Sequence, residues 1–561
     1  MPAKEMTGAK ILVEALKRAG VEILFGYPGG SVIPIFDVLY DEPAIKFVLT
    51  RHEQGAGHAA DGYARATGKT GCVIATSGPG ATNLVTAIAN AYMDSVPIVA
   101  LTGQVKTMLI GNDAFQEADI TGISRPITKH NYLVKDVNDL ARVVKEAFHI
   151  ASTGRPGPVL IDVPTDVTLQ KAAMPDDVEI DLPGYKPTFH GHPQQIQKAA
   201  DLINKAERPV LYAGGGVIIS EASEELFEIA TKAHIPVTTT LMGLGAFPET
   251  HPLSLHMLGM HGTVYANYAV TNCDALIAVG ARFDDRVTGK LTAFAPNAKV
   301  IHIDIDPSAI SKNMQVDIPI VGDCKDVLGQ LKELVTPHKH EAWMKTVAEW
   351  KEKYPLTYPT DNGKLYPQMI VETLYKVTNG DAIIATDVGQ NQMWAAQFYY
   401  YTKPRTFISS GGLGTMGFGL PAAIGAQLGR PDKRVALVTG DGSIQMNIQE
   451  LATAQRLGLP IVIVLLNNGY LGMVRQWQEL FYNRRYSQTT LDGNPDFVKL
   501  AEAYGAKGMR VTKPEEVEDT LREAFDSGQF TFIDFVVERE ANVFPMVPSG
   551  EAIDRMIGGM A

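Results

Sequence analysis

The sequence has few cysteines, no excess of basic residues and no long apolar run. Its three cysteines, Cys72, Cys273 and Cys324, show neither disulfide nor metal-ligand spacing, which predicts buried apolar side chains in a reducing compartment. The net charge of −12 argues against a surface for nucleic acids or anionic membranes. No apolar segment approaches the roughly 20 residues that cross a bilayer, and the N-terminal segment has helical spacing rather than a targeting signal. These absences favour a cytoplasmic enzyme that acts on small molecules.

The length of the chain and two polar, proline-rich segments indicate three parts. With 561 residues, it exceeds what one hydrophobic core usually serves. Polar, proline-rich linkers are expected at residues 174–187 and about 354–366. The first and third parts repeat one layout of strand, glycine turn, helix, proline and strand, which predicts parallel-sheet units. We therefore predict an α/β protein of three Rossmann-like domains with mostly parallel sheets, over residues 1–180, 190–350 and 365–561, in which the first and third share a layout.

Two short strings in the third part have the spacing of a magnesium-diphosphate site. A Gly-Asp-Gly string at 440–442 and an Asn-Asn string at 467–468 each follow a predicted buried strand, and residues 443–457 are predicted to form a helix. Asp441 and Asn468 then lie at the carboxyl ends of neighbouring strands, where open α/β sheets bind ligands. Carboxylate and amide oxygens suit Mg²⁺, and a helix N-terminus suits phosphate. Either string alone is typical of a ligand-free turn, so the prediction depends on their joint placement.

The spacing of 27 residues between Asp441 and Asn468 resembles the diphosphate motif of enzymes that depend on thiamine diphosphate. That resemblance implies a second half-site, in another domain, with a glutamate that contacts the aminopyrimidine ring. The candidate is Glu53, within the string Arg-His-Glu-Gln-Gly-Ala-Gly at 51–57. A solvated glutamate is the ordinary alternative. The small residues that follow Glu53 instead predict a buried helix, in which a carboxyl has the shifted acidity that proton transfer needs.

Further strings resemble the acetohydroxyacid synthase (acetolactate synthase) family and extend over nearly the whole chain. They occupy residues 25–30, 51–57, 76–83, 113–119, 280–289, 411–421 and 472–477. The resemblance implies a transferase that decarboxylates pyruvate and transfers the two-carbon unit to a second pyruvate or to 2-ketobutyrate. The products would be 2-acetolactate or 2-aceto-2-hydroxybutyrate, for valine, leucine and isoleucine biosynthesis. A flavin-dependent pyruvate oxidase is the alternative, and a flavin-free acetolactate synthase is disfavoured by the string at 282–289.

The resemblance also implies which residues hold the cofactors thiamine diphosphate, Mg²⁺ and FAD. The expected metal ligands are Asp441, Asn468 and the backbone carbonyl of Tyr470. The residues expected around thiamine diphosphate are Gly30, Glu53, Thr76, Pro79, Asn83, Val388, Gly389, Gln390, Gly414, Met416, Gly442, Ser443, Asn468, Gly472 and Met473. The residues expected around FAD are Arg155, Gly214, Gly215, Gly216, Thr240, Leu241, Leu258, Gly259, Met260, His261, Gly280, Arg282, Asp284, Arg286, Asp304, Ile305 and Asp323. The flavin is expected to be structural, because the condensation involves no net oxidation.

The residues of the middle domain leave its ligand open. The Gly-Gly-Gly string at 214–216 is not a full dinucleotide-binding fingerprint. From the residues alone, a domain that binds a dinucleotide and a degenerate domain without a ligand are about equally compatible with this string.

For the reaction, the resemblance implies catalytic roles for Glu53, Gln116 and Met416, and substrate contacts from Phe115, Met260, Arg286 and Trp477. The Arg286 guanidinium would bind the carboxylate of the second keto acid. Its alternative is a surface ion pair with Asp284 or Asp285.

The resemblance has consequences for assembly, because in that family the two ends of the cofactor contact different subunits. It implies a homodimer at minimum, with a homotetramer as the larger alternative, and a small regulatory subunit as a further partner.

Three positions depart from the expected pattern. Thr165 stands where a lysine is usual, Asn391 where a histidine is common, and Met242 where a glutamine is expected beside the flavin. These departures affect the predicted substrate entrance and inhibitor response more than the reaction.

Overall fold

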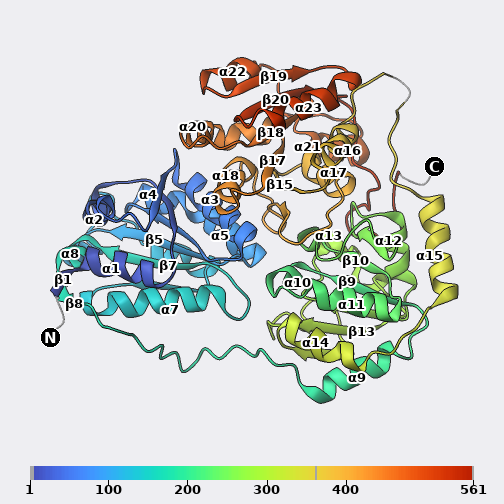
Figure 1. The fold of residues 1–561 in the computed structure, drawn as a ribbon, viewed down its shortest axis with the longest axis horizontal. Coiled ribbons are helices and arrows are strands. Elements are labelled where there is room, and N and C mark those ends of the chain that lie inside the picture. Colours follow the sequence, from blue (N-terminus) through green and yellow to red (C-terminus); the bar gives the residue numbers. More distant parts are fainter. Residues whose placement is uncertain (1–4, 361–362, 559–561) are drawn as a thin grey trace.

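The computed structural model describes residues 5–360 and 363–558. The described chain contains three six-stranded sheets whose paired strands are all parallel, which confirms the predicted α/β class with three Rossmann-like units. Figure 1 shows the three units in chain order, the first in blue to cyan, the middle one in green to yellow and the last in orange to red. Residues 174–187 run between the first two units without a regular element, and the second predicted linker includes 361–362, which lie outside the described residues.

The first sheet has its strands in the order β3, β2, β4, β5, β7 and β6. Their bounds are β2 Ile23–Gly26, β3 Lys46–Leu49, β4 Gly71–Ala75, β5 Ile98–Gln104, β6 His130–Leu133 and β7 Val159–Pro164. Helices α1 (Gly8–Arg18) and α7 (Leu140–Ser152) share a core with one face, and α3 (Glu53–Thr67) and α5 (Val85–Asp94) share a core with the other. Every residue of the central strands β4 and β5 is buried, because helices cover both faces of the sheet.

The third sheet repeats the strand order of the first. It runs β16, β15, β17, β18, β20, β19, with bounds β15 Ala382–Thr386, β16 Phe407–Ile408, β17 Arg434–Gly440, β18 Val462–Asn467, β19 Lys507–Val511 and β20 Thr531–Val536. Numbered along the chain, both sheets have the order 2-1-3-4-6-5, which confirms the predicted similarity of layout. Helices α16 (Pro367–Thr378), α17 (Gln390–Phe398) and α23 (Val517–Asp526) cover one face, and α18 (Gly419–Gly429), α20 (Leu451–Arg456) and α22 (Phe497–Ala503) cover the other.

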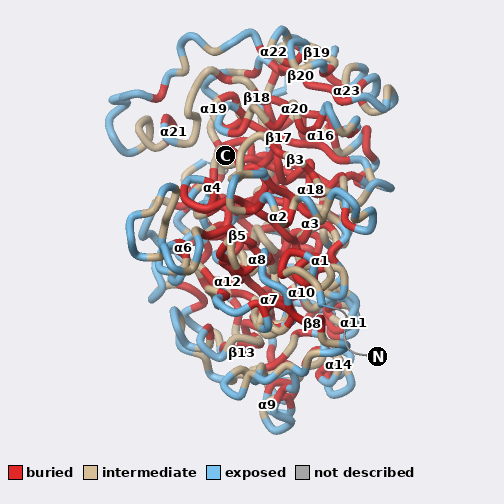
Figure 2. The backbone as a smooth tube through the Cα atoms, turned by 90° about the vertical axis from the view of Figure 1, so that its left-hand side faces the viewer, coloured by how far each residue is buried: buried red, intermediate tan, exposed pale blue. Residues whose placement is uncertain are grey.

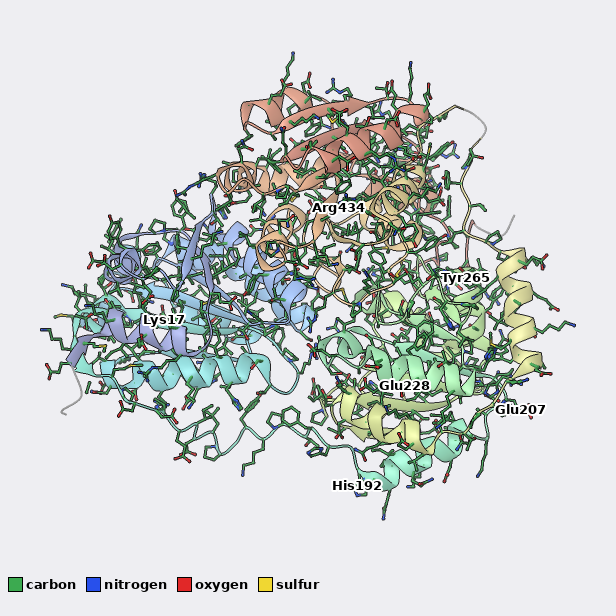
Figure 3. The ribbon with its side chains drawn as sticks, viewed as in Figure 1. Lys17, His192, Glu207, Glu228, Tyr265 and Arg434 are labelled. Atoms are coloured by element: carbon green, nitrogen blue, oxygen red, sulfur yellow. The ribbon has the colours of Figure 1, made fainter. Side chains whose placement is uncertain are left out.

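The middle sheet has a different order, β11, β10, β9, β12, β13 and β14. Its strands are β9 Pro209–Ala213, β10 Val237–Thr239, β11 Ser254–Met257, β12 Ala275–Val279, β13 Lys299–Asp304 and β14 Ile318–Val321. Numbered along the chain, this order is 3-2-1-4-5-6, the arrangement of dinucleotide-binding sheets, which bind ligands where the order reverses. The reversal falls between β9 and β12. Helix α9 (Pro193–Ile203) packs beneath this sheet, with His192 at its start and Glu207 beyond its end (Figure 3).

Burial follows the sheets and the helices that pack between the domains. Figure 2 shows the strands as buried bands beneath exposed loops. Helix α3 packs against α18 of the C-terminal domain, and its residues from Gly55 to Ala64 are buried, as predicted from their small size. The three cysteines are also buried, as predicted, and burial raises the pKa of the Cys72 thiol to about 12. Within the ranges 5–360 and 363–558, no helix combines the length and apolarity needed to span a bilayer.

The prediction of one helix over residues 443–457 is wrong. The structure has a short helix α19 (Asp441–Ile444), a 3-10 segment η7 (Gln445–Glu450) and then α20. Asn447 leaves the helical region, with φ −134° and ψ 32°. Its side-chain amide donates to the carbonyl of Gly417 at 2.8 Å, a long-range contact that competes with regular helix geometry and that helical propensity does not contain.

Asp162, on β7, is a buried acid that is expected to make the stability of the first domain depend on pH. Its carboxylate is 1% exposed and accepts hydrogen bonds from Thr102 at 2.7 Å and Gln104 at 3.0 Å. Burial, partly offset by these bonds, raises the pKa of Asp162 to about 7. An unfolded aspartate titrates at roughly 3.9. The folded protein therefore binds this proton more tightly than the unfolded chain, and stability is lost as the pH rises from about 4 through 7.

Replacing Asp162 by asparagine is expected to remove most of that pH dependence, which amounts to roughly 3–4 kcal/mol between pH 4 and 8. The asparagine carbonyl accepts from Gln104 and its amide donates to the Thr102 hydroxyl, so the packing is kept. The measurement is the urea midpoint of unfolding from pH 5 to 8 for the wild type and the variant. Asp37→Asn, at an exposed position of α2 (Ile33–Tyr40), is the control. Parallel midpoint curves for wild type and Asp162→Asn would contradict the assignment.

Candidate functional site

A small cavity opens at the carboxyl ends of β17 and β18, next to β15, where the strand order of the third sheet reverses. Its volume is about 90 Å³. Both Asp441 and Asn468 line it, as do all of the C-terminal residues predicted around thiamine diphosphate except Gly414. The lining residues predicted from the sequence are Val388, Gly389, Gln390, Met416, Asp441, Gly442, Ser443, Asn468, Tyr470, Gly472 and Met473. The structure therefore brings together residues that are far apart in the chain.

Asp441, which lines this cavity, has one carboxylate oxygen without a hydrogen-bond partner among the described residues. It is 1% exposed, and its Oδ2 accepts a hydrogen bond from the side-chain amide of Asn494 at 2.7 Å. Its Oδ1 is buried and has no hydrogen-bond partner within the described chain. Burial raises the pKa of Asp441 to about 6. A buried carboxylate oxygen without a donor is costly unless a cation neutralises it, so the Asp441 side chain fits a metal ion.

Asn468 is fixed beside Asp441 by a network of amides. Its Oδ1 accepts from the backbone N–H of Tyr470 at 3.0 Å, and its Nδ2 donates to Gln390 Oε1 at 3.2 Å. Gln390 is held in turn by Gln476 at 2.9 Å. No cluster of three or more His, Cys, Asp or Glu side chains in the described ranges could hold a metal ion. One carboxylate with amide and carbonyl oxygens is a donor set suited to Mg²⁺ together with phosphate and water, rather than to zinc.

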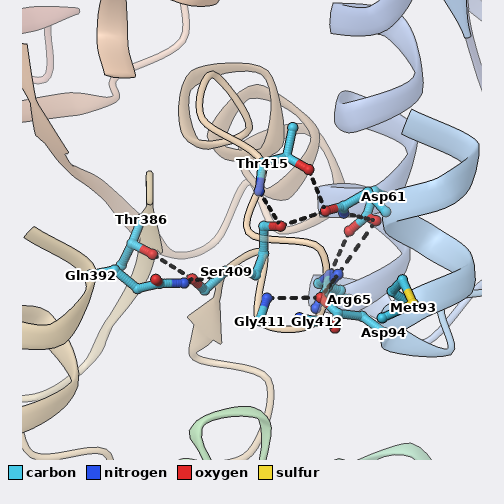
Figure 4. A network of polar contacts seen from close by, with 12 residues as sticks. Asp61, Arg65, Met93, Asp94, Thr386, Gln392, Ser409, Gly411, Gly412 and Thr415 are labelled. Atoms are coloured by element: carbon cyan, nitrogen blue, oxygen red, sulfur yellow. Dashed lines mark hydrogen bonds and ion pairs between the residues drawn. The ribbon is translucent and has the colours of Figure 1, made fainter. Parts of the chain in front are cut away.

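The loop that carries Gly414 and Met416 is anchored by the N-terminal domain (Figure 4). The carboxylate of Asp94, at the end of α5, accepts from the backbone N–H groups of Gly411 at 3.0 Å and Gly412 at 2.7 Å. Arg65 of α3 donates to Asp94 at 2.9 Å and also pairs with Asp61. The Asp94 and Asp61 side chains are fully buried. Met416 therefore reaches the small cavity from a loop whose start is fixed by a carboxylate of another domain.

Removing the Asp94 carboxylate is expected to release this loop. In Asp94→Ala, Arg65 keeps one buried partner and two loop amides lose their acceptor, which is expected to cost about 3–5 kcal/mol of stability. Thiamine diphosphate should also bind more weakly, because Met416 and Gly414 lose their fixed positions. Thermal unfolding and calorimetric titration with thiamine diphosphate and Mg²⁺ measure the two effects. Thr86→Ala, at an exposed position of the same helix, is the control, and equal values for both variants would contradict the anchoring role.

The N-terminal half of the predicted site surrounds Glu53. Glu53 is the first residue of α3, and His52 caps the helix by accepting from the backbone N–H of Gln54 at 3.1 Å. The side-chain amide of Asn83 donates to Glu53 Oε2 at 3.0 Å. The hydroxyl of Thr76 lies 2.9 Å from that of Ser31, which follows Gly30. The predicted residues Pro79 and Asn83 are the first and last residues of α4.

The small cavity does not extend to the N-terminal half of the predicted site. The small cavity is lined by residues from 388 to 474 only, and Glu53, Thr76 and Asn83 are not among them. Gln116 packs its backbone against Gly78, while Phe115 is 89% exposed and contacts no described pocket. The small cavity is therefore formed by the C-terminal domain without the residues of the predicted N-terminal half.

A second, larger cavity of about 580 Å³ lies between the three domains. All the residues predicted around FAD line it except Gly259, which lies between the lining residues Leu258 and Met260. It also includes Ser95 of the N-terminal domain, and Val388, Met473 and Trp477 next to the small cavity. The volume lies within the range of ligand pockets, which is roughly 300–1,000 Å³.

The glycines of the large cavity permit a close approach of backbones at the reversal between β9 and β12. A Cβ at Gly216 would lie 2.6 Å from the Cα of Gly280, and a Cβ at Gly214 would clash with the Gly280 carbonyl. Asp304, at the end of β13, lies in the same cavity, and burial raises its pKa to about 6. Open α/β sheets bind their ligands at the carboxyl ends of the strands beside such a reversal, where this cavity places its glycines and Asp304. The residues present therefore fit a dinucleotide.

Three arginines line the large cavity. Arg155 donates to Ser95 at 2.8 Å and pairs with Asp306 at 3.2 Å, and Arg282 donates to the Met93 carbonyl at 2.7 Å. Both therefore connect the N-terminal domain to the middle domain.

The third arginine, Arg286, is 60% exposed. Its guanidinium lies 6.0 Å from the ring centre of Trp477 and its Nη1 lies 3.9 Å from the Met260 sulfur, so three of the four predicted substrate residues meet at one end of the cavity. The alternative predicted for Arg286, a surface ion pair, is also found, since its Nε lies 3.6 Å from the Asp285 carboxylate.

The three residues that depart from the family pattern, Thr165, Asn391 and Met242, have well-defined surroundings in the structure. Thr165 donates to the carbonyls of Gln104 at 3.0 Å and Ser31 at 3.3 Å. Asn391 is buried in the small cavity wall with its Oδ1 unpartnered among the described atoms, and Met242 lines the large cavity against Gly411. The sequence reading missed Asp94 and Asn494, which contact the site without belonging to any motif.

Comparison with protein families assigns the chain to the thiamine pyrophosphate enzymes. Residues 6–123 match the N-terminal TPP binding domain, residues 196–331 the central domain and residues 387–535 the C-terminal TPP binding domain. Each match falls on one of the three sheets. The fold and the two half-sites thus belong to one class of enzymes.

Curated relatives define the family more closely. The acetolactate synthase large subunit of Haemophilus influenzae is 50% identical, over 99% of this chain and 98% of that protein. The probable acetolactate synthase large subunit of Methanocaldococcus jannaschii is 52% identical, over 98% and 95%. The acetolactate synthase isozyme 3 large subunit of Escherichia coli is 49% identical, over 98% of each. The chain therefore belongs to the acetolactate synthase large-subunit family, which confirms the resemblance seen in its sequence.

Proposed function

We propose that this chain forms 2-acetolactate from two molecules of pyruvate, and 2-aceto-2-hydroxybutyrate when 2-ketobutyrate is the acceptor. The observation that carries the proposal is the unpartnered, buried Oδ1 of Asp441 beside Asn468, in a chain whose family is acetolactate synthase. Thiamine diphosphate, when bound, supplies the carbon nucleophile and the electron sink for decarboxylation. Asp441, Asn468 and the carbonyl of Tyr470 would hold Mg²⁺, and Ser443, in the single turn of α19, would face the diphosphate.

The chain's own groups have separate tasks in this reaction. Glu53, oriented by Asn83, holds and moves a proton at the pyrimidine end of the cofactor. Met416, which lines the small cavity at the end of the anchored loop, would contact the cofactor. Arg286 binds the carboxylate of the acceptor keto acid, and Trp477 restricts the space beside it. FAD would occupy the large cavity in a structural role, because the reaction changes no net oxidation state.

The active unit is proposed to be at least a homodimer in which each site combines Glu53 of one chain with Asp441 of another. Exposed apolar side chains flank both halves, namely Ile33 and Phe115 near the first, and Met446 and Val474 near the second. Their burial against a second copy would complete the site and remove apolar surface from water. A small regulatory subunit is proposed as a further partner, because the relatives are named large subunits.

The experiment that tests the proposal measures acetolactate formation from pyruvate with each of thiamine diphosphate, Mg²⁺ and FAD omitted in turn, together with the mass of the particle by light scattering. Activity should require thiamine diphosphate and Mg²⁺ and coincide with a dimer or larger particle. Added pyruvate should leave the flavin oxidised. Rapid bleaching of the flavin without acetolactate would instead indicate a pyruvate oxidase and overturn the proposal.

A further inference from the structure

The first turn of α3, which begins with Glu53, is held by a carboxylate from the C-terminal domain. Glu450, the last residue of η7, is fully buried. Its Oε1 accepts a hydrogen bond from the backbone N–H of Arg51 at 2.9 Å, and its Oε2 lies 3.2 Å from the same nitrogen. The backbone amide of His52 also stabilises this carboxylate. Glu450 therefore holds the two residues that precede Glu53.

The fit between Glu450 and α3 is close. A Cβ placed on Gly55 would lie 2.5 Å from Glu450 Oε1, so no side chain can stand between the carboxylate and the helix. On the other side, the hydroxyl of Thr453 donates to Glu450 Oε2 at 2.6 Å. With both oxygens bonded, the Glu450 carboxylate has one position relative to residues 51–55.

A buried carboxylate between two domains stabilises the folded protein less than an apolar contact of the same size would. Burial raises the pKa of Glu450, against the lowering effect of its hydrogen bonds, so the ionised group costs free energy that an apolar contact would not. What the carboxylate adds is direction, because it orients backbone N–H groups that apolar packing would leave free to shift. The backbone N–H groups of Arg51 and His52 directly precede Glu53, so their orientation sets the position of Glu53.

The segment that carries Glu450 begins at Asp441. Helix α19 starts with Asp441 and continues directly into η7, which ends with Glu450. Asn447, between them, donates to the carbonyl of Gly417 at 2.8 Å and so ties the segment to the loop that follows Met416. One short, anchored stretch of chain therefore contacts the small cavity at one end and the start of α3 at the other.

We propose that Glu450 is a positioning residue for Glu53, acting through the backbone of Arg51 and His52. The inference rests on the proposed function, in which Glu53 exchanges a proton with the cofactor. In the proposed dimer, Asp441 and Glu53 of one chain belong to two different active sites. Residues 441–450 then join the metal end of one site to the acid of the other.

The test is Glu450→Gln, a variant of the same shape that keeps one acceptor oxygen. Its Oε1 can still accept from the Arg51 N–H with the amide nitrogen turned to the Thr453 hydroxyl. The variant loses the second oxygen, which lies 3.2 Å from the Arg51 nitrogen, and the negative charge that holds the backbone amides of residues 51 and 52, so the start of α3 is expected to shift. The main readout is the rate of hydrogen–deuterium exchange at the thiazolium C2 of bound thiamine diphosphate, followed by NMR of quenched samples. We expect this rate and kcat to fall by about 10- to 100-fold, the loss that small misplacements produce. The KM for pyruvate and the Kd for thiamine diphosphate with Mg²⁺ should stay within about twofold, because neither contacts Glu450.

The matched control is Arg405→Gln. Arg405 also ties the domains together, through the carbonyls of Arg65 at 3.2 Å and Ile218 at 3.4 Å, without approaching Glu53. This control should lower the melting temperature and leave the exchange rate unchanged. If Glu450→Gln lowers the melting temperature but exchanges C2 at the wild-type rate, Glu450 is only a structural tie and the inference is overturned. A wild-type enzyme that fails to accelerate C2 exchange over the free cofactor would instead overturn the proposed function.

Discussion

Replacing Glu53 by glutamine is expected to lower the rate of acetolactate formation by about 100- to 10,000-fold, the range that positioned acid–base groups contribute. Glutamine keeps the size of the side chain and a hydrogen-bond acceptor for the Asn83 amide, which lies 3.0 Å from Glu53 Oε2. It cannot take up or release the proton. Helix α3 should fold as before, because its cap is the His52 side chain and not Glu53.

The measurement pairs initial rates from pyruvate with calorimetric titration of thiamine diphosphate in the presence of Mg²⁺. Affinity should change little, because the metal and diphosphate contacts are in the other domain. Glu22→Gln removes a carboxylate that is 62% exposed in the same domain and is the control for loss of charge. Turnover of Glu53→Gln at the wild-type rate would remove Glu53 from the mechanism.

Replacing Asp441 by asparagine is expected to have opposite effects on the cofactor-free and cofactor-bound protein. Without metal, the buried Oδ1 has no partner, so removing the charge should raise the melting temperature. With Mg²⁺ and thiamine diphosphate present, the variant lacks the one carboxylate of the site. Its affinity for the cofactor should fall by at least about 100-fold, since even the outer partners of metal ligands are worth 10- to 100-fold.

Thermal unfolding with and without Mg²⁺ and thiamine diphosphate measures both effects in one titration. The two melting curves of Asp441→Asn should nearly coincide, while those of the wild type should separate, because a ligand stabilises only the state that binds it. Asp492→Asn, at an exposed position of the nearby loop, should behave as the wild type. A variant stabilised by the cofactor as strongly as the wild type would exclude Asp441 as a metal ligand.

The three-domain architecture and the convergence of the residues that line the small cavity could be predicted, because both depend on local sequence patterns. Apolar runs bounded by glycine and proline define strands such as β17 and β18. Strands in a parallel sheet end on the same side, so the residues after them converge, as Asp441 and Asn468 do. The Glu53 helix was predictable as a buried one from its glycines and alanines. The roles of these residues stay predictions until the experiments above are done.

The three parallel sheets, their repeated layout and the strings at the strand ends follow from the sequence, because periodicity, turn chemistry and residue size act over short stretches of chain. Three contacts could be seen only in the folded protein: Asp94 anchors the loop of Met416, Asn447 interrupts the predicted helix, and Glu450 reaches Arg51. These contacts join segments up to 399 residues apart. Their partners have no fixed spacing and no local pattern, since they meet only when whole domains pack and each buried polar group must find a hydrogen bond.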